Sequence, residues 1–397
     1  DQLHETRRAQ TTAESTNEFL QSVLTAADPV LLGRNATVLD AVKFAAREIG
    51  PRFQNEPMVE AGVRATVGGV YAEFGETTEA RAQLTRAIEL LREHRGDQAL
   101  ETLETRKVLA MIEWDMAPSA AAGLPVERIV EEMRAALGPD HRVTLAAEAD
   151  LAGVYVADHR FVKAHDLLAR AAEMRTRLGD EDSLSALRTL QMLAMTKSFL
   201  GRFDEGIQML GQLIERMKRV LGERHYQVYM AHFDLAIELD RHARYQEAAD
   251  HFDKVVNGLR PQLPKGHEYV YMSARGLAAL YANRLNRPAE ALALFAPDFA
   301  DYTARADHEK LQVPAGHEVL GCCYLKLDRL EEAEAEFLLA RAGFIGLMGG
   351  TVNPAVKKMD GLLAEVYERL GKPDLARKFR EGDPTPGPPG EPAAKDK

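Results

Sequence analysis

Cysteine and tryptophan are scarce in this sequence of 397 residues, which contains two of the first and one of the second. The two cysteines, Cys322 and Cys323, are adjacent. Neighbouring residues of a helix point in different directions, so these two thiols cannot easily form a disulfide with each other. The chain is therefore not a disulfide scaffold, and its cysteine usage does not assign it to a compartment.

Long apolar runs and an excess of positive charge are also lacking. No stretch approaches 18 uninterrupted apolar residues, so we expect no direct membrane insertion by this chain. The 50 Lys and Arg residues are outnumbered by 61 Asp and Glu residues, which gives a net charge of -11. That balance argues against nucleic-acid partners, because neutralising phosphates requires a basic surface. The sequence has no signal peptide and starts at Asp1, and we expect further sequence before it in the full gene product.

What the sequence does contain is a repeat. Small residues recur at intervals of 42 or 43 positions: Ala80, Ala122, Ala164, Gly206, Ala248, Ala291, Ala333 and Ala376. Twelve positions earlier stands a second set: Gly68, Ala110, Ala152, Ala194, Ala236, Ala279, Gly321 and Ala364. An inserted residue shifts the frame near Ala279, so Ala278 is the better match there. Side chains without bulk let two helices approach closely, so each unit is predicted to be a helical hairpin.

Other positions of the repeat support the hairpin. Glycines such as Gly75 and Gly201 supply the positive φ that ends a first helix. An apolar residue one turn after the second small position is expected to pack the second helix back onto the first: Leu84, Leu168, Leu210, Phe252 and Phe337. The links between units also recur, and each of three of them ends in a histidine with an expected structural role: His141, His225 and His267.

This pattern resembles the tetratricopeptide repeat, in the longer 42-residue form found in kinesin light chain and many bacterial proteins. The resemblance covers roughly residues 60–380 and implies an all-α fold, a right-handed α-solenoid of tetratricopeptide-type hairpins. The expected organisation is an N-terminal linker with capping helices over 1–57, about eight repeat units over 58–381 and a disordered Pro/Gly-rich tail over 382–397. The second unit is degenerate: Glu113 replaces a tyrosine, and Pro118 and Pro125 are expected to disturb its hairpin.

The N-terminal segment predicts two amphipathic helices that cap the solenoid. The first covers residues 14–27. The second begins at Thr37, with Asp40 at capping-box spacing, and its apolar side consists of Val38, Ala41, Val42, Ala45 and Ile49.

This segment carries a second resemblance. Asn17-Glu18-Phe19-Leu20, Ala27-Asp28-Pro29 and Pro57-Met58-Val59-Glu60-Ala61 are similar to the region that links the membrane segment to the repeats in large bacterial serine/threonine protein kinases. The match spans about residues 13–96. The kinase signatures His-Arg-Asp and Asp-Phe-Gly are absent from this chain.

Residues capable of catalysis or metal binding do not form a known motif. His267-Glu268 and His317-Glu318 begin like the zinc-protease motif, but Tyr271 and Gly321 stand where its second histidine belongs. Four histidines without helical i, i+4 pairing are expected on the surface: His159, His165, His242 and His251. Cys322 is predicted to pack rather than react. The sequence therefore predicts no enzyme, no cofactor and no metal site.

The groove of a helical-repeat solenoid is the remaining place for a ligand. In tetratricopeptide proteins the ligand lies against the first helices, and transferring those positions selects Met111, Trp114, Asp150, Arg188, Gln191, Met195, Met230, Asp234 and Arg275. A tryptophan and methionines beside mixed charges suit a protein or peptide partner. The alternative is that Trp114 fills the degenerate unit and that the methionines belong to the core.

Two functions remain open. The first is a non-catalytic scaffold, the interaction or sensor region of a bacterial serine/threonine protein kinase, which would recruit a protein, a peptide or another copy of itself. It would lie on either the cytoplasmic or the extracytoplasmic side of the membrane. The alternative is a stand-alone or transcription-factor-linked peptide receptor.

Overall fold

The computed structural model describes residues 37–305, 312–348 and 353–382. These residues form seventeen helices and no strand. The expected helix over 14–27, the first part of the kinase-linker match (residues 13–36) and nearly all of the Pro/Gly-rich tail lie outside this part of the chain. Among the helices that are described, none combines the length and apolarity needed to cross a membrane.

Among the described residues, a single helix, α3 (Val38–Arg52), precedes seven helical hairpins and two further helices, α10 (Leu184–Phe199) and α11 (Phe203–Leu221), which belong to different compact units. The paired helices are α4 (Pro57–Glu73) and α5 (Thr77–Arg95), α6 (Leu100–Met116) and α7 (Ala120–Leu137), α8 (Arg142–Ala157) and α9 (Phe161–Arg177), α12 (Tyr226–Arg241) and α13 (Tyr245–Leu259), α14 (Glu268–Asn283) and α15 (Pro288–Thr303), α16 (Gln312–Lys326) and α17 (Leu330–Met348), and α18 (Pro354–Arg369) and α19 (Pro373–Glu381). Between α9 and α12 along the chain lie α10 and α11.

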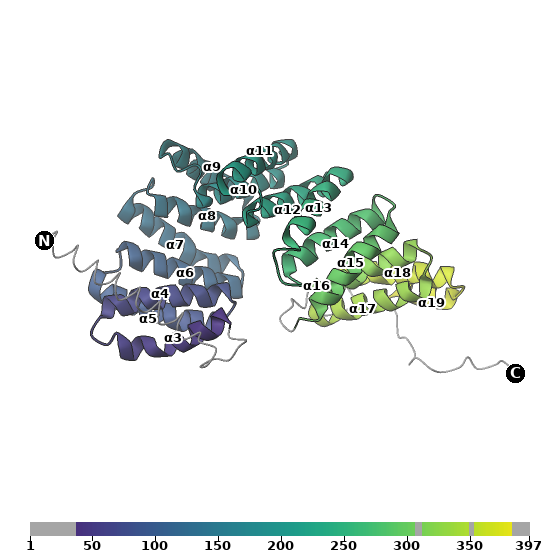
Figure 1. Cartoon of the computed structure of the whole chain (residues 1–397), viewed down its shortest axis with the longest axis horizontal. Coiled ribbons are helices and arrows are strands. Elements are labelled where there is room, and N and C mark those ends of the chain that lie inside the picture. The colour runs from purple at the N-terminus through teal and green to yellow at the C-terminus, as the bar shows by residue number, and fades with distance from the viewer. Residues whose placement is uncertain (1–36, 306–311, 349–352, 383–397) are drawn as a thin grey trace. The chain divides into compact units, whose positions relative to one another are not determined.

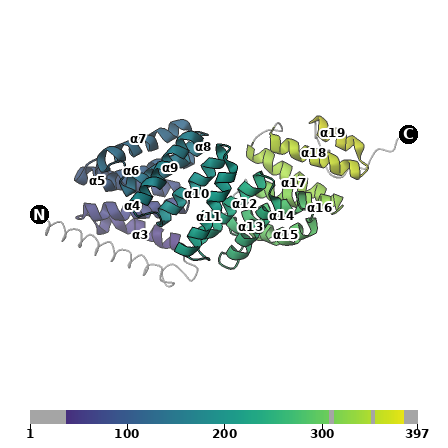
Figure 2. The same ribbon diagram turned by 90° about the horizontal axis from the view of Figure 1, so that it is seen from above.

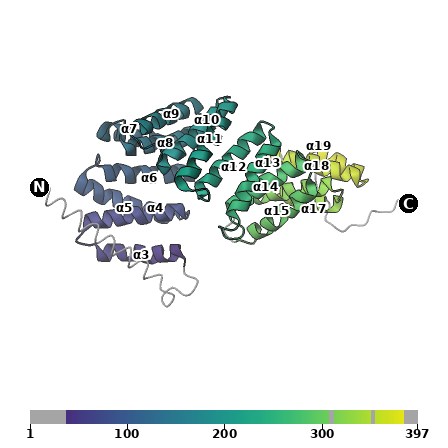
Figure 3. The ribbon, with the colours of Figure 1, turned by 45° about the horizontal axis from the view of Figure 1, so that its top comes forward.

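The chain divides into two compact units, Asp1–Leu200 and Gly201–Lys397. Unit 1 contains α3 to α10 and unit 2 contains α11 to α19. Within each unit a helix packs against the next one along the chain, and Figure 1 shows α4 to α9 of unit 1 as successive layers. Figures 2 and 3 show the same succession from two further directions, with α12 to α15 of unit 2 side by side. Such nearest-neighbour packing is the architecture of an α-solenoid.

The repeated small residues lie where the two helices of a hairpin cross. Ala80, Ala164 and Ala248 are fully buried. A Cβ atom added to Gly68 would stand 2.7 Å from Cγ of Leu84, and one added to Gly321 would stand 2.5 Å from Cε1 of Phe337. The apolar side chain of the second helix therefore occupies the space that the small residue leaves, which confirms the predicted packing.

The inserted residue in the α14–α15 hairpin has the predicted effect. Ala278 is fully buried, whereas Ala279 is only half-buried. The frame thus shifts by one position in α14, as the sequence indicates.

The recurring histidines of the links cap the next helix. The backbone amides of Val143, Gln227 and Tyr269 donate to Nδ1 of His141, His225 and His267, over 3.3, 3.2 and 3.3 Å respectively. An amide at a helix start has no partner within the helix, so a ring nitrogen that accepts from it stabilises the end. The structural role predicted for these three histidines is confirmed.

The start of α3 agrees with the sequence in its cap and differs in its apolar face. The amide of Asp40 donates to Oγ1 of Thr37 over 3.1 Å, and the amide of Thr37 donates to Oδ2 of Asp40 over 3.0 Å. These two bonds form the predicted capping box. Ala41, Val42, Ala45 and Ile49 are buried, but Val38 is 67% exposed. Its assignment to the buried face was wrong, because this side chain at the first position of the helix is exposed to solvent.

The degenerate second unit forms a complete hairpin. Pro118 lies in the turn between α6 and α7, before the N-cap Ser119, whose Oγ accepts a hydrogen bond from the amide of Ala122 over 3.1 Å. Pro125 lies within α7, and the helix continues past it to Leu137. The expectation that these prolines disturb the hairpin was wrong, since one precedes the helix and the other removes a single backbone donor.

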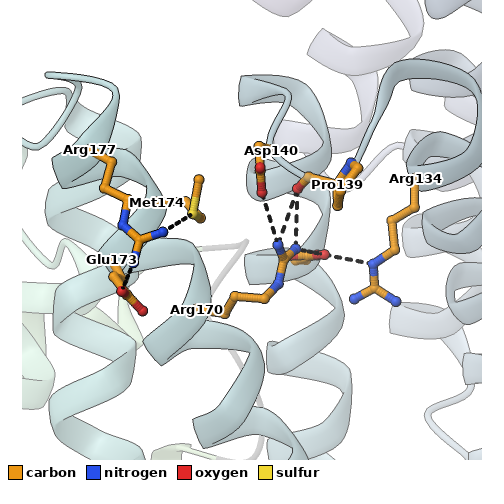
Figure 4. A network of polar contacts seen from close by, with 8 residues as sticks. Arg134, Pro139, Asp140, Arg170, Glu173, Met174 and Arg177 are labelled. Carbon is orange, nitrogen blue, oxygen red and sulfur yellow. Dashed lines mark hydrogen bonds and ion pairs between the residues drawn. The ribbon is translucent and has the colours of Figure 1, made fainter.

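A buried glutamate ties three helices of unit 1 together. Glu148 on α8 has a fully buried side chain, and its Oε1 accepts from Nε of Arg134 on α7 over 2.7 Å and from Nη2 of Arg170 on α9. Arg170 also donates to the carbonyl oxygen of Pro139 in the link between α7 and α8, over 3.3 Å. Figure 4 shows the guanidinium group of Arg170 pointing toward Pro139 and Asp140, and the side chain of Arg134 on the opposite side of these contacts.

Candidate functional site

All nine residues predicted to line the groove lie on the first helix of a repeat unit. Eight of them are half-buried, and Arg188 is exposed. Six belong to unit 1: Met111 and Trp114 on α6, Asp150 on α8, and Arg188, Gln191 and Met195 on α10. Three belong to unit 2: Met230 and Asp234 on α12, and Arg275 on α14.

Two of these residues meet at one hollow in unit 1. Asp150 and Arg188 line a cavity of about 290 Å³ between α8 and α10. Its residues on α8 and α10 follow helical i, i+3, i+4 spacing, so the hollow runs along one face of each helix. The remaining lining residues are Ala146, Ala149, Leu184, Ser185, Thr189 and Met192.

Side chains beneath the hollow hold its polar wall in place. Nη2 of Arg175, a residue that is only 2% exposed, donates to Oγ of Ser185 over 2.8 Å. The Thr189 hydroxyl donates to the carbonyl oxygen of Ser185 over 2.8 Å. Because both hydroxyls of the wall have partners in the protein, the hollow is preorganised before any ligand arrives.

The charge of the hollow is unbalanced. Nζ of Lys107, on α6, forms an ion pair with Oδ2 of Asp150. Arg188 has no ion pair or hydrogen bond with any residue that the structure describes, and it stands beside the exposed apolar side chain of Leu184. With Asp150 neutralised by Lys107, the guanidinium of Arg188 gives the hollow an excess positive charge.

The other predicted residues do not join this hollow. Trp114 and Arg275 each keep a buried nitrogen, Nε1 and Nε respectively, without a hydrogen-bond partner in the described part of the chain. Orphaned donors of this kind are rare in folded proteins and suit sites where a ligand supplies the acceptor. The two residues belong to different units, and they remain separate candidates.

Sequence reasoning missed Lys107, Leu184, Ser185 and Met192. Two signals were present. Lys107 lies 43 residues before Asp150, one more than the 42-residue interval between these units, so the two fall at neighbouring positions on successive first helices. Met192 follows Arg188 by four residues and therefore shares its helix face.

The cysteines and histidines that were considered for catalysis or metal binding can now be described by their surroundings. Burial raises the pKa of the Cys322 thiol to about 11 and that of Cys323 to about 12, which lowers the thiolate population at neutral pH. Within residues 37–305, 312–348 and 353–382, no group of three or more His, Cys, Asp or Glu side chains could hold a metal ion. The surface placement expected for His251 was wrong: its Nδ1 lies 2.7 Å from Nδ1 of His232, a buried residue.

Comparisons with known proteins support the repeat. A family model described as tetratricopeptide repeat matches residues 182–260. No curated protein matches the sequence. The fold resembles the apo form of the quorum sensor NprR from B. thuringiensis, with a TM-score of 0.62 and 11% identity over 94% of this chain and 97% of that one.

Two further structures are similar. The apo form of RapI matches with a TM-score of 0.56 and 12% identity, over 94% of this chain and 96% of that one. Kinesin-light-chain-like repeats from Podosopora anserina match with a TM-score of 0.46 and 21% identity, over 53% of this chain and 99% of theirs. At these identities the likeness concerns the fold alone. The helical hairpins, the family match over residues 182–260 and the two structures with TM-scores above 0.5 together show an all-α, right-handed solenoid fold of the tetratricopeptide type.

Proposed function

We propose that this chain is a protein-binding scaffold whose unit 1 binds a peptide segment at the hollow between α8 and α10. The tetratricopeptide fold suggests a scaffold of this kind. Arg188 is the observation that supports the assignment to this hollow. It is an exposed cation without a partner among the described residues, and it lines a cavity with an apolar wall.

The chemistry of the hollow defines the segment. Asp150 is already paired with Lys107, so the free charge offered to a ligand is that of Arg188. A carboxylate side chain on the partner would form a charge-assisted pair with this guanidinium. The aliphatic surfaces of Leu184 and Met192 would contact an apolar side chain next to it. We therefore propose a segment with an acidic residue beside an apolar one.

A library of acetylated and amidated decapeptides passed over the immobilised chain tests this assignment. We expect enrichment of sequences that place Asp or Glu next to an apolar residue. The Arg188→Gln variant should bind the enriched peptides about tenfold more weakly, because hydrogen bonds to charged groups are worth about 1.5–3 kcal/mol.

The control is Arg128→Gln, which removes another exposed arginine of unit 1, on α7, that has no described partner. It should leave peptide affinity unchanged. Equal weakening by both variants would mean that only general charge matters, and a library with no enrichment would reject the assignment.

The finer proposal is that the scaffold serves as the interaction or sensor region of a bacterial serine/threonine protein kinase. Its support is the resemblance of residues 13–96 to the linker of such kinases, of which residues 13–36 lie before the described residues. The gene sequence upstream of Asp1 tests it. We expect a kinase domain with His-Arg-Asp and Asp-Phe-Gly, followed by a transmembrane helix, and an upstream region without either would reject the kinase assignment.

The second candidate is a peptide receptor. The likeness of the fold to a quorum sensor, over nearly the full length of both chains, favours it. A receptor of this kind should tighten when it binds its ligand, so X-ray scattering during a titration with an enriched peptide should show a smaller radius of gyration. Constant dimensions at saturation would count against a receptor and leave the scaffold.

A further inference from the structure

A second hollow lies in unit 2, away from the predicted groove residues. It measures about 600 Å³ and is formed by the end of α13, the link that follows it, α14 and α15. Cavities of roughly 300–1,000 Å³ are the size that proteins use for small molecules. Neither the repeat pattern nor the proposed peptide site involves this hollow.

One wall is a rigid face of α15. Ala293, Pro297 and Asp301 line the hollow at intervals of four residues, so they lie on one side of the helix. The other side is anchored in the core of unit 2. Tyr302 is 1% exposed, and its ring stacks on that of Tyr271 with centroids 4.0 Å apart. The face toward the hollow is therefore held by packing behind it.

The link between α13 and α14 forms the opposite wall and contacts α15. Gly266 has φ +68°, and a Cβ atom added there would stand 2.3 Å from the backbone oxygen of Asp301. Only glycine allows both this conformation and this approach. The neighbouring Lys265 thereby lines the same hollow as Asp301.

The polar groups of the hollow are of two kinds. Nη2 of Arg260 and Oδ2 of Asp298 form an ion pair at 2.7 Å, with the Asp298 side chain only 13% exposed, so these two charges satisfy each other. The side chains of Lys265 and Asp301 have no hydrogen bond or ion pair with any residue of the described chain. They also do not pair with each other, and so leave one free cation and one free carboxylate on the same cavity.

A backbone acceptor joins the free carboxylate. Pro297 has no N–H, so the carbonyl oxygen of Ala293, four residues earlier, receives no helical hydrogen bond from it. Both residues line the hollow. The side of the cavity made by α15 thus combines the Asp301 carboxylate with a carbonyl that lacks its usual donor, which is an environment for a group with several N–H donors.

We propose that this hollow binds a free amino acid with an aliphatic side chain. The α-ammonium group would donate to the Asp301 carboxylate and the Ala293 carbonyl, and the α-carboxylate would pair with Lys265. The side chain would lie against Val270 and Leu294, which form the apolar floor. One ligand then complements the two free charges and the apolar surface together.

Isothermal titration of the purified chain with L-leucine tests this proposal. We expect saturable one-site binding. Two analogues each remove one charge: leucinamide lacks the carboxylate, and 4-methylpentanoate lacks the ammonium. Each should bind at least about tenfold more weakly, since hydrogen bonds to charged groups are worth about 1.5–3 kcal/mol. Absence of saturable binding by L-leucine, or equal binding of either analogue, would overturn the proposal.

Two variants locate the site. Asp301→Asn and Lys265→Gln should each weaken L-leucine binding about tenfold or more. Matched controls remove exposed charges elsewhere in unit 2: Asp204→Asn on α11 and Lys357→Gln on α18. These should leave the affinity unchanged. Binding that survives both site variants would overturn the assignment, and circular dichroism checks that all four variants retain their helices. Peptide binding by unit 1 is a separate readout, so failure of one proposal does not imply failure of the other.

Discussion

The hairpin α8–α9 of unit 1 and the hairpin α12–α13 of unit 2 differ at one matching position. Four residues before the small residue of the first helix stands Glu148 in the former and His232 in the latter. Glu148 is fully buried and His232 is 4% exposed. The repeat thus places a polar side chain inside both hairpins at a position where a solenoid core is expected to be apolar.

The two hairpins satisfy this group in different ways. Glu148 accepts hydrogen bonds from Arg134 and Arg170 and so joins three helices through charge. His232 shares a single hydrogen bond with His251 on α13, between nitrogens 2.7 Å apart. Burial, together with the charge of His251 and then Lys218 and Lys254, lowers the pKa of His232 to about 3, against a smaller opposing effect of Glu215. The same repeat position therefore holds a carboxyl group between two guanidinium groups in unit 1 and one member of a pair of imidazoles in unit 2.

Two other hairpins show that this contact belongs to the repeat. Nη1 of Arg64 donates to Oε1 of Gln83 over 2.6 Å, and Nδ1 of His317 lies 2.7 Å from Oε2 of Glu336. Each pair spans 19 residues, as do His232 and His251. In three hairpins the polar contact across the two helices therefore joins residues 19 positions apart, and the side chains that make it differ in each.

The largest effect is expected at Glu148. Glu148→Ala leaves Arg134 and Arg170 without their common acceptor, and removing one partner of a buried ion pair costs about 3–5 kcal/mol. Urea denaturation should show a loss of free energy of unfolding of about 3 kcal/mol. Hydrogen exchange should accelerate in α7 to α9 first.

The control is Glu131→Ala, because Glu131 also pairs with Arg134 but its side chain is 67% exposed. It should change stability little, since exposed pairs are worth less than about 1 kcal/mol. Equal losses in the two variants would show that burial of the acceptor is not what matters.

The next largest effect is a pH dependence of stability, which is expected in the α12–α13 hairpin of unit 2. The pKa of His232 is lowered to about 3 and that of His251 to about 4, the latter by burial first and then by Lys254. The unfolded chain therefore binds protons on these rings below about pH 6.5, while the folded chain resists them. The stability that the neutral rings give α12 and α13 is present above pH 6.5 and should fall as the pH drops to 4, by up to about 1.4 kcal/mol for each unit of pKa shift.

Hydrogen exchange at pH 7 and pH 4, corrected for intrinsic rates, measures this in each hairpin. His251→Gln keeps a hydrogen-bonding side chain that does not titrate, so it should flatten the pH dependence of α12 and α13. A wild-type protein in which α12 and α13 keep their protection at pH 4 would contradict the linkage.

The smallest loss of stability is expected at the arginine that stands just before the second helix of a hairpin. In unit 1, Nη1 of Arg160 pairs with Oε1 of Glu127 on α7 at 2.6 Å, and its guanidinium lies 4.0 Å from the ring centre of Tyr155. In unit 2, Arg244 pairs with Glu247 only three residues on. Arg160→Gln should cost about 1 kcal/mol in thermal or urea denaturation, and Arg244→Gln less than about 0.5 kcal/mol. If Arg244→Gln lost more stability than Arg160→Gln, the contact of Arg160 with the neighbouring hairpin would not add to the stability of the folded chain.

The hairpins could be read from the sequence because the signals are local and repeated. Gly68 and Gly321 mark crossings, and the link histidines mark helix starts at a fixed period. The contact between His232 and His251 was missed because the search for paired histidines used the i, i+4 spacing of a single helix. The pair lies across two helices, and its 19-residue spacing has meaning only when the hairpin is known.

At the candidate sites, too, some residues could be predicted from the sequence and others could not. Asp150 and Arg188 could be selected because first-helix positions follow from the repeat. Their neighbour Lys107 and the ion pair it forms could not, because the length and direction of a lysine side chain are not set by periodicity. The hollow beside Gly266 depends on how closely the link approaches α15, and this approach is set by packing of the rings behind it.

The sequence by itself determined the helical class and the residues at the crossings of the hairpins, because both depend on small side chains and helix ends within about forty positions of one another. Only the tertiary structure decided which polar groups are satisfied and which stay free. The sequence selects Arg188 only by its position in the repeat, and it does not distinguish Lys265 and Asp301 from other charged residues. Their lack of partners appears only when the distances between helices are known, because an ion pair forms over a few ångströms in space whatever the separation along the chain.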